Sequence, residues 1–197
     1  MTLAASRPTL IDALWPEKTA PLARGIVLAL VGSLLLTASA KAQFPMWPVP
    51  MTMQSFVVLV IGMAYGARLA GVTVALYLLQ GALGLPVFAG TPEKGIGLAY
   101  MAGPTGGYLA GFLLVAVLMG WLAERGWDRK ALSSLAALTI GTVLLFVPGV
   151  AWLTVLIGSE KAVQTGLVPF LFGSVLKLAL AAAVLPLAWK AVELRQS

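Results

Sequence analysis

The sequence contains neither cysteine nor histidine. Without cysteine the chain can form no disulfide and no thiolate metal site, and without histidine it lacks the commonest metal ligand and the commonest general base. Its seven acidic residues lie in polar segments or near the ends of apolar ones, so no carboxylate pair stands inside an apolar segment. We therefore expect no catalytic residue, no metal and no cofactor, which disfavours an enzyme.

Charged side chains are also scarce. They make up 10% of the 197 residues, whereas hydrophobic residues make up 60% and the mean hydropathy is +0.97. These values lie far outside the range of soluble domains and indicate an integral membrane protein. Because about 20 apolar residues span a bilayer, we predict an all-α fold with six transmembrane helices in one bundle. The predicted spans cover residues 25–42, 52–66, 69–84, 105–123, 132–157 and 169–189.

The polar ends of the chain set the predicted domain boundaries. We expect an N-terminal tail over 1–23, without the features of a signal peptide and with a short interfacial helix at 9–15. The six-helix domain then covers 24–190, and a short C-terminal tail covers 191–197.

Two breaks are expected within the apolar segments. We divide residues 52–84 into two spans because one helix of that length would greatly exceed the membrane thickness. Pro148 and Gly149 should kink or interrupt the fifth span. We find no convincing internal repeat, which disfavours a carrier built from inverted repeats.

The basic residues indicate the orientation in the membrane. The net charge is +6, but the basic residues are scattered over loops without interleaved aromatics, so we expect no nucleic-acid partner. With six spans, nine of them fall on the side of the termini and three on the other. The positive-inside rule then places both termini in the cytoplasm. The connections 43–51, 85–104 and 158–168 face outward, and function is expected there.

A single lysine interrupts the last apolar segment. Lys177 lies near the middle of residues 168–187, and no predicted span holds a carboxylate that could neutralise it. An ionisable residue inside the membrane indicates a functional site, and the missing anion can be a ligand. The alternative is that Lys177 reaches an interface or bonds backbone carbonyls.

The first two outward connections contain the polar and aromatic residues that can form a binding site. In 44–56 three prolines impose extended backbone and hold Trp47, Thr52 and Gln54 at the mouth of the bundle, although Trp47 also fits an interfacial aromatic belt. The connection 84–112 is long enough to be a binding loop and includes Lys94.

Small and polar residues in the spans have two interpretations each. Glycines 103, 107 and 111 permit close approach of either a helix or a ligand. Gln80 needs a buried partner, on a neighbouring helix or on a ligand. Ala29, Ser33 and Thr37 share one face of the first span, which suits packing within the bundle or docking to another membrane subunit.

Several of these motifs together resemble a known family. The sequence is similar to BioY, the biotin-binding substrate-capture subunit (S component) of energy-coupling-factor (ECF) vitamin transporters, across residues 48–177. The matching motifs are Pro48-Val-Pro50-Met-Thr52-x-Gln54-x-Phe56, Tyr77-Leu, Gly84-Leu-Pro-Val-Phe88-Ala-Gly90, Gly103-Pro-Thr-Gly-Gly-Tyr-Leu109-x-Gly-Phe112, Trp152-Leu153 and Pro169-Phe-x-x-Gly173-x-x-x-Lys177. The chain departs from the family at Ser174, where an aspartate is usual; a serine can hydrogen bond but supplies no carboxylate.

The resemblance implies a biotin-binding S component in a bacterial plasma (inner) membrane, a six-helix bundle that works with a transmembrane coupling subunit and two cytoplasmic ATPases. The sequence has no ATP-binding motif of its own. Whether the chain forms a homo-oligomer is left open. Biotin needs a cation for its carboxylate, polar groups for its ureido ring and an apolar wall for its bicycle. We expect Lys177, with Lys94 second, for the carboxylate. For the ureido ring we choose among Gln80, Ser174, Gln54 and Thr52, and for the apolar wall among Phe88, Tyr108, Trp152 and Trp47.

The Ala29, Ser33 and Thr37 face is then expected to contact the coupling subunit, since no ligand motif lies there. Two alternatives to biotin binding are kept: an S component for another small vitamin, and a non-catalytic membrane assembly subunit.

Overall fold

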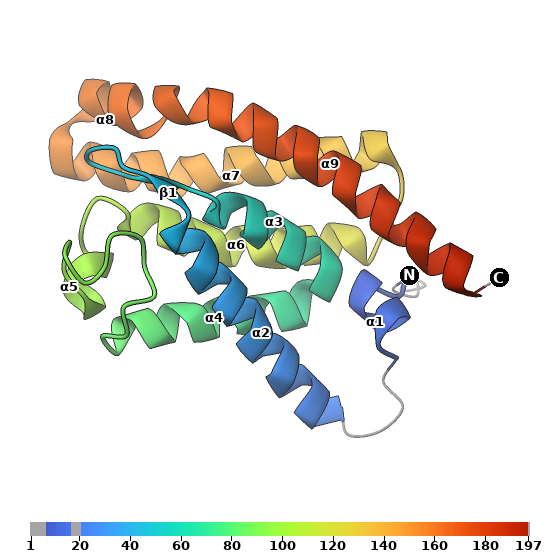
Figure 1. Ribbon diagram of the computed structural model, residues 1–197. Coiled ribbons are helices and arrows are strands. Elements are labelled where there is room, and N and C mark those ends of the chain that lie inside the picture. Colours follow the sequence, from blue (N-terminus) through green and yellow to red (C-terminus); the bar gives the residue numbers. More distant parts are fainter. Residues whose placement is uncertain (1–6, 17–20, 197) are drawn as a thin grey trace, which may run out of the picture.

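The computed structural model describes residues 7–16 and 21–196, and these residues are mostly helical (Figure 1). Six longer helices, α2, α3, α4, α6, α7 and α9, cover Pro21–Lys41, Gln54–Tyr65, Ala67–Ala82, Gly106–Ala123, Ala131–Ile157 and Val168–Gln196. Three short helices, α1, α5 and α8, cover Leu10–Leu14, Gly97–Met101 and Ser159–Gly166. Two short strands, β1 (Gln43–Phe44) and β2 (Met51–Thr52), pair antiparallel with Gln43 opposite Thr52.

The described helices differ in their length relative to a membrane. By length and composition, four segments can cross one: α2, α6, α7 and Ser159–Leu194, which combines α8 with most of α9. Helices α3 and α4 are apolar but have only 12 and 16 residues. At about 1.5 Å per residue they are shorter than the hydrocarbon core of about 30 Å. The predicted spans thus correspond to four helices of full length and two shorter ones.

The expected division of residues 52–84 occurs at Gly66. This residue ends α3 and precedes α4 with φ of 79°, in the left-handed region that glycine adopts without a steric penalty. The carboxylate of Glu124 accepts a hydrogen bond from the Ala67 backbone N–H at 2.8 Å, which satisfies one of the free donors at the start of α4.

Pro148 does not interrupt the fifth predicted span, because α7 continues through it from Ala131 to Ile157. The helix packs closely on α6 at this point. A Cβ on Gly107 would collide with the Pro148 carbonyl oxygen and the Trp152 side chain, and a Cβ on Gly111 would press on Leu145. These two glycines of the 103, 107 and 111 series therefore serve helix packing.

The core of the bundle lies between α3, α4, α6 and α7. Met63, Val74, Val115 and Leu138 are fully buried there. Large apolar side chains are exposed on the outer faces of α2, α7 and α9, including Phe172. An exterior of this kind suits contact with lipid chains.

The two ends of the molecule differ in character (Figure 1). One end holds α5, α8 and the β-hairpin, and the described parts of both tails lie at the other. Helix α1 lies where a short helix was expected at 9–15, and α9 continues as helix through the predicted C-terminal tail to Gln196. Residues 1–6 and 17–20 of the predicted N-terminal tail lie outside the described residues.

A buried polar contact fixes α9 at the end with the termini. The Asp128 carboxylate, in the loop after α6, accepts a hydrogen bond from the Trp189 indole N–H at 2.5 Å. Burial raises the pKa of the Asp128 carboxyl group, although this hydrogen bond opposes the shift. The guanidinium of Arg129 lies over the Trp189 ring, 4.2 Å from its centroid.

Candidate functional site

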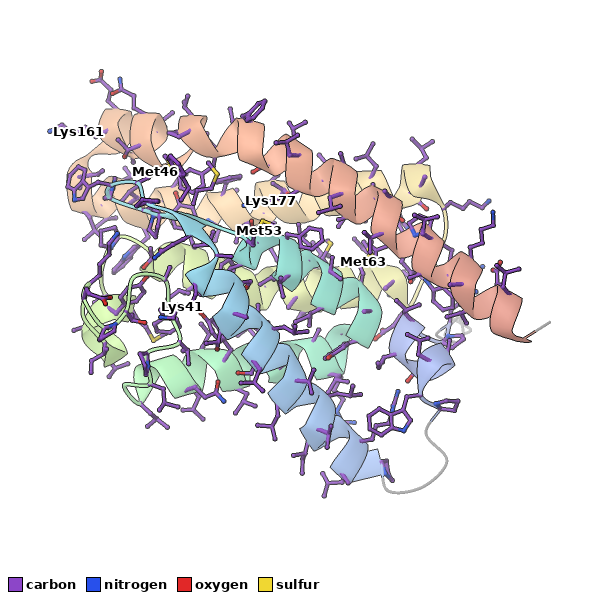
Figure 2. The ribbon with its side chains drawn as sticks, in the orientation of Figure 1. Lys41, Met46, Met53, Met63, Lys161 and Lys177 are labelled. Carbon is purple, nitrogen blue, oxygen red and sulfur yellow. The ribbon has the colours of Figure 1, made fainter. Side chains whose placement is uncertain are left out.

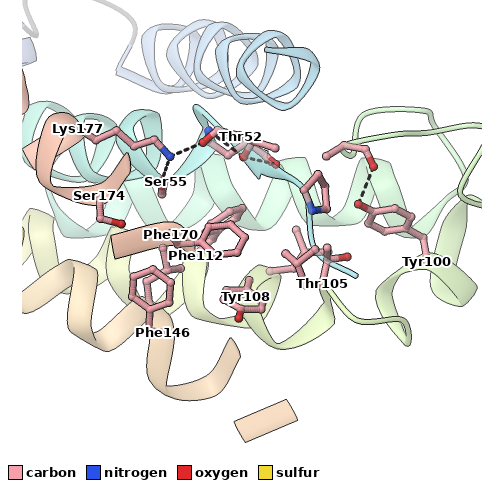
Figure 3. A pocket seen from close by; sticks show the side chains of 16 residues that line it. Thr52, Ser55, Tyr100, Thr105, Tyr108, Phe112, Phe146, Phe170, Ser174 and Lys177 are labelled. Atoms are coloured by element: carbon pink, nitrogen blue, oxygen red, sulfur yellow. Dashed lines mark hydrogen bonds between the residues drawn. The ribbon is translucent and has the colours of Figure 1, made fainter. Parts of the chain in front are cut away.

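A cavity lies inside the bundle toward the end that holds the hairpin and α5 (Figure 3). It encloses about 570 Å³ of space not filled by protein atoms, part of it open to solvent. Segments far apart in the sequence form its walls: residues 49–55, Ala89, α5, α6, α7 and the first part of α9. The cavity combines polar groups with an aromatic wall, as small-molecule sites do.

Lys177 supplies the positive charge of this cavity. Its ammonium donates hydrogen bonds to the Thr52 carbonyl oxygen at 2.5 Å and to the Ser55 hydroxyl at 3.1 Å (Figures 2 and 3). Neither partner is charged, and no described acidic residue forms a salt bridge with it. Ser174 lies one turn earlier on α9 and lines the same cavity. The ammonium is therefore hydrogen bonded but has no counter-ion among the described residues.

Three aromatic rings form the apolar part of the cavity wall. Tyr108, Phe146 and Phe170 come from α6, α7 and α9, and their centroids are 6.2 to 6.4 Å apart. The Tyr108 hydroxyl donates to the Gly166 carbonyl oxygen at 2.7 Å, so its polar end is satisfied outside the cluster. Phe112 adds a further ring to this wall (Figure 3). The wall can hold a flat or bicyclic apolar group.

A buried hydrogen-bond chain positions the polar residues after β2. The Gln54 amide donates to the Tyr77 hydroxyl at 2.7 Å, and this hydroxyl donates to the Val87 carbonyl oxygen at 3.1 Å. The Thr52 hydroxyl accepts a hydrogen bond from the Gln54 backbone N–H at 3.2 Å, at the first residue of α3. These hydrogen bonds connect α3 and α4 to the loop that carries Ala89 into the cavity.

Comparison with known proteins assigns the chain to one family. The model of the BioY family matches residues 10–194. The chain is 36% identical to the biotin transporter BioY of Thermotoga maritima over 162 residues, which covers 82% of this chain and 93% of that protein. The chain belongs to the BioY family.

A second relative and a solved structure are also similar to this chain. The biotin transporter BioY of Rhizobium etli is 38% identical over 144 residues, with 68% of this chain and 75% of that protein covered. The fold is similar to the crystal structure of the S-component for biotin from an ECF-type ABC transporter, with a TM-score of 0.73 and 21% identity over 89% of this chain and 92% of that one. The BioY family is a transporter family, as expected for a chain predicted to have no catalytic residues.

The structure brings together five of the ten predicted ligand residues of this BioY chain. Thr52, Gln54, Tyr108, Ser174 and Lys177 all line the cavity. They come from three BioY-like motifs that are far apart in the sequence.

The two remaining polar candidates lie outside the cavity. Gln80 accepts a hydrogen bond from the Ser33 hydroxyl, so its partner is on the neighbouring helix α2. Lys94 is exposed on the turn after Gly90. Their positions give neither residue a contact with the space beside Lys177.

Three aromatic candidates also lie elsewhere. Phe88 is buried between Tyr77 and Tyr100, with ring centroids 5.4 and 5.0 Å away, and only its neighbour Ala89 reaches the cavity. The Trp152 indole N–H donates to the Gly103 carbonyl oxygen at 2.9 Å. Trp47 is 79% exposed at the hairpin. These three side chains do not line the cavity.

The expected docking face on the first span needs a correction. Ala29 and Ser33 are only 4% and 1% exposed, and Ser33 is bonded to Gln80 of α4. Thr37 is half-buried and donates to the Ser33 carbonyl oxygen at 3.0 Å. This face packs within the chain because small side chains allow α2 to approach α4, so it does not support a contact with a coupling subunit.

Sequence reasoning missed several cavity residues. Phe170 stands four residues before Ser174 and seven before Lys177, which is one face of a helix, so this spacing could have identified it. Ser55, Thr105 and Phe112 lie within the quoted motifs. No motif marks Phe146, which reaches the cavity only because α7 packs beside α6.

Lys41 fixes the loop that closes one side of the cavity. Its ammonium, at the end of α2 (Figure 2), donates to the carbonyl oxygens of Phe88 and Thr91 at 3.0 and 2.9 Å and to the Thr91 hydroxyl at 3.1 Å. Ala89 lies between these acceptors and lines the cavity. The ammonium thus binds the loop on both sides of a wall residue.

We expect Lys41→Met to loosen this loop, because the variant keeps an apolar side chain but removes all three hydrogen bonds. Backbone amides of residues 88–95 should exchange hydrogen faster. A bound ligand should dissociate about 3- to 10-fold faster; the change is modest because these hydrogen bonds are partly exposed to solvent. Hydrogen exchange by mass spectrometry and ligand dissociation rates measure both. Lys161→Met, which removes an exposed ammonium of α8 with no described hydrogen bond, is the control. Equal exchange in both variants would contradict this role.

Proposed function

We propose that this BioY-family chain is the biotin-binding S component of an ECF-type transporter and takes part in biotin uptake. The observation that carries the proposal is the cavity that contains Lys177, whose ammonium is hydrogen bonded to neutral groups alone among the described residues. A half-buried cation beside an open space suits an anionic ligand. The relatives named as biotin transporters support biotin as that ligand.

The chemistry of biotin matches the two sides of the cavity. We assign the biotin carboxylate to Lys177, with the Ser174 hydroxyl one turn away as a hydrogen-bond donor. The thioether bicycle lies against Tyr108, Phe146 and Phe170. Gln54 is then the predicted polar group left for the ureido ring, since Thr52 lies directly beside Lys177, at the carboxylate end.

All six longer helices are proposed to cross a bacterial plasma (inner) membrane, with both termini in the cytoplasm. Helices α3 and α4 are short, and the hairpin 43–52 and the loop 83–96 extend the protein beyond them at the outward end. Irregular backbone at membrane depth is tolerated where it is buried in protein or lines a cavity, as the residues around Val49 and Ala89 do. The cavity therefore opens toward the outside.

Energy for uptake must come from partners, since the sequence has no ATP-binding motif. We propose a transmembrane coupling subunit and two cytoplasmic ATPases, as the resemblance to the BioY family implies; the structural neighbour is the S-component of an ECF-type ABC transporter.

The proposal is tested by extracting the full chain in detergent and measuring bound biotin by mass spectrometry, followed by calorimetric titration. Biotin should co-purify and bind at one site per chain, and a tenfold excess of other vitamins should not displace it. Displacement by another vitamin would make the chain an S component for that vitamin. A chain that binds no vitamin would contradict the proposal and favour an assembly subunit.

A further inference from the structure

A second cavity lies at the end of the molecule with the termini. It is a groove between the first halves of α2 and α4, with α1 beside it, and contains about 1740 Å³ of space, part of it open to the surroundings. Figure 1 shows the beginning of α2 extending away from the other helices. A Cβ on Gly25, in this part of α2, would meet no atom within 4 Å.

The walls of the groove are apolar along the helices. Val72 and Leu76 follow Arg68 at intervals of four residues on α4, and Ile26 and Leu30 are spaced in the same way on α2. Residues spaced by four share one helix face, and eight residues extend about 12 Å. Val72, Ile26 and Leu30 are 54%, 52% and 46% exposed. The groove is therefore lined by apolar side chains along the helices and opens at the side of the bundle.

The groove is positively charged at the end near the termini. Arg24 is already paired with Asp12 at 3.0 Å, and hydrogen bonds from Thr9 and Arg24 lower the pKa of Asp12 in spite of its partial burial. Glu124 accepts the Ala67 backbone N–H. Arg68 is exposed and has no hydrogen bond or ion pair with any of the described residues. Its guanidinium is thus a cation of the groove without a partner among the described residues.

We propose that this groove binds an anionic phospholipid of the surrounding bilayer. The phosphate lies beside Arg68, and an acyl chain lies between the aliphatic residues of α2 and α4. The groove has the polarity of a phospholipid, charged at one end and apolar over the next two helical turns, and guanidinium groups bind phosphate in two-point geometry. Basic pockets between transmembrane helices on the cytoplasmic side suit such headgroups. The site is separate from the Lys177 cavity and does not depend on biotin binding.

Native mass spectrometry of the full chain tests whether the Arg68 charge contributes to lipid binding. The protein is equilibrated in detergent with phosphatidylglycerol or with phosphatidylcholine of the same acyl chains. The wild type should retain more phosphatidylglycerol, and Arg68→Gln should reduce this preference about fivefold. Lys190→Gln removes an exposed charge of α9 at the same end of the molecule but away from the groove. It should leave the preference unchanged. Equal losses in both variants, or none in Arg68→Gln, would overturn the proposal.

A second pair of variants tests the apolar part of the groove. Val72→Trp fills the groove at an exposed position and should reduce the retention of both lipids, whereas Val143→Trp, at an exposed position of α7, should not. Thermal unfolding in detergent checks that both variants are folded. If Val72→Trp keeps its lipid but no longer assembles with a coupling subunit, the groove binds a protein and the proposal fails.

Discussion

Lys177→Ala should weaken biotin binding by roughly 30-fold to several thousand-fold. Removing one member of a buried charge pair costs about 2–5 kcal/mol, and every 1.4 kcal/mol changes a dissociation constant about tenfold. The size of the effect follows from the position of Lys177, whose ammonium is held by Thr52 and Ser55 but has no anion beside it among the described residues. Calorimetry or tryptophan fluorescence on detergent-solubilised protein measures the change.

The ligand offers a sharper test of the same charge pair. Biotin methyl ester keeps the bicycle and the ureido ring but removes the negative charge. Wild-type protein should strongly prefer biotin, whereas Lys177→Ala should bind biotin and its ester with similar weak affinity. A variant that retains the full preference for the free acid would show that another cation holds the carboxylate. Lys94 would be the next candidate, and its loop would then have to move, because it does not line the cavity.

Gly120→Ala should strongly destabilise the fold, although it adds only one methyl group. A Cβ at this position of α6 would collide with backbone atoms of Gly66 and Ala67, at the turn between α3 and α4. Backbone atoms cannot rotate away as a side chain can, so the helices must separate. Overpacking of this kind costs about 1–3 kcal/mol or more, which is roughly 5- to 150-fold in the folding equilibrium. Thermal unfolding in detergent should show a clearly lower midpoint.

Gly25→Ala is the matched control for this prediction. It is the same substitution in another helix, at a position where a Cβ would meet no atom within 4 Å. Alanine is favoured over glycine inside a helix by about 0.5–1 kcal/mol, so this variant should be as stable as the wild type or more stable. Similar destabilisation by both substitutions would show that the contact with the α3–α4 turn does not decide the result, because helix propensity favours alanine at both positions.

Ser174 is the position where the motif resemblance to the BioY family gives an aspartate. It lines the cavity one turn before Lys177, where the usual aspartate would place a carboxylate beside the ammonium. The serine leaves Lys177 without that internal anion, since no described acidic residue pairs with it. The positive charge is then available to the ligand, which is why the methyl ester comparison should show a large difference in this protein.

The sequence by itself determined the membrane class, the helical fold and the location of the apolar segments. Long apolar stretches have few alternatives in a bilayer, because every backbone group must be hydrogen bonded inside its own helix. The break near Gly66 followed from length alone. Lys177 was identified for the same kind of reason, since a lysine in an apolar span is costly wherever the span packs. Motifs also located Thr52, Gln54, Tyr108 and Ser174.

Only the tertiary structure decided which polar and aromatic residues share a cavity. Gln80 and Ser33 both needed partners, and the packing of α2 on α4 gave them to each other. Phe146 entered the site because α7 lies beside α6, while Phe88 was enclosed by Tyr77 and Tyr100. Sequence patterns state that a side chain is buried or needs a hydrogen bond. They do not state which neighbour meets that need, because the neighbour depends on how helices distant in the sequence are packed.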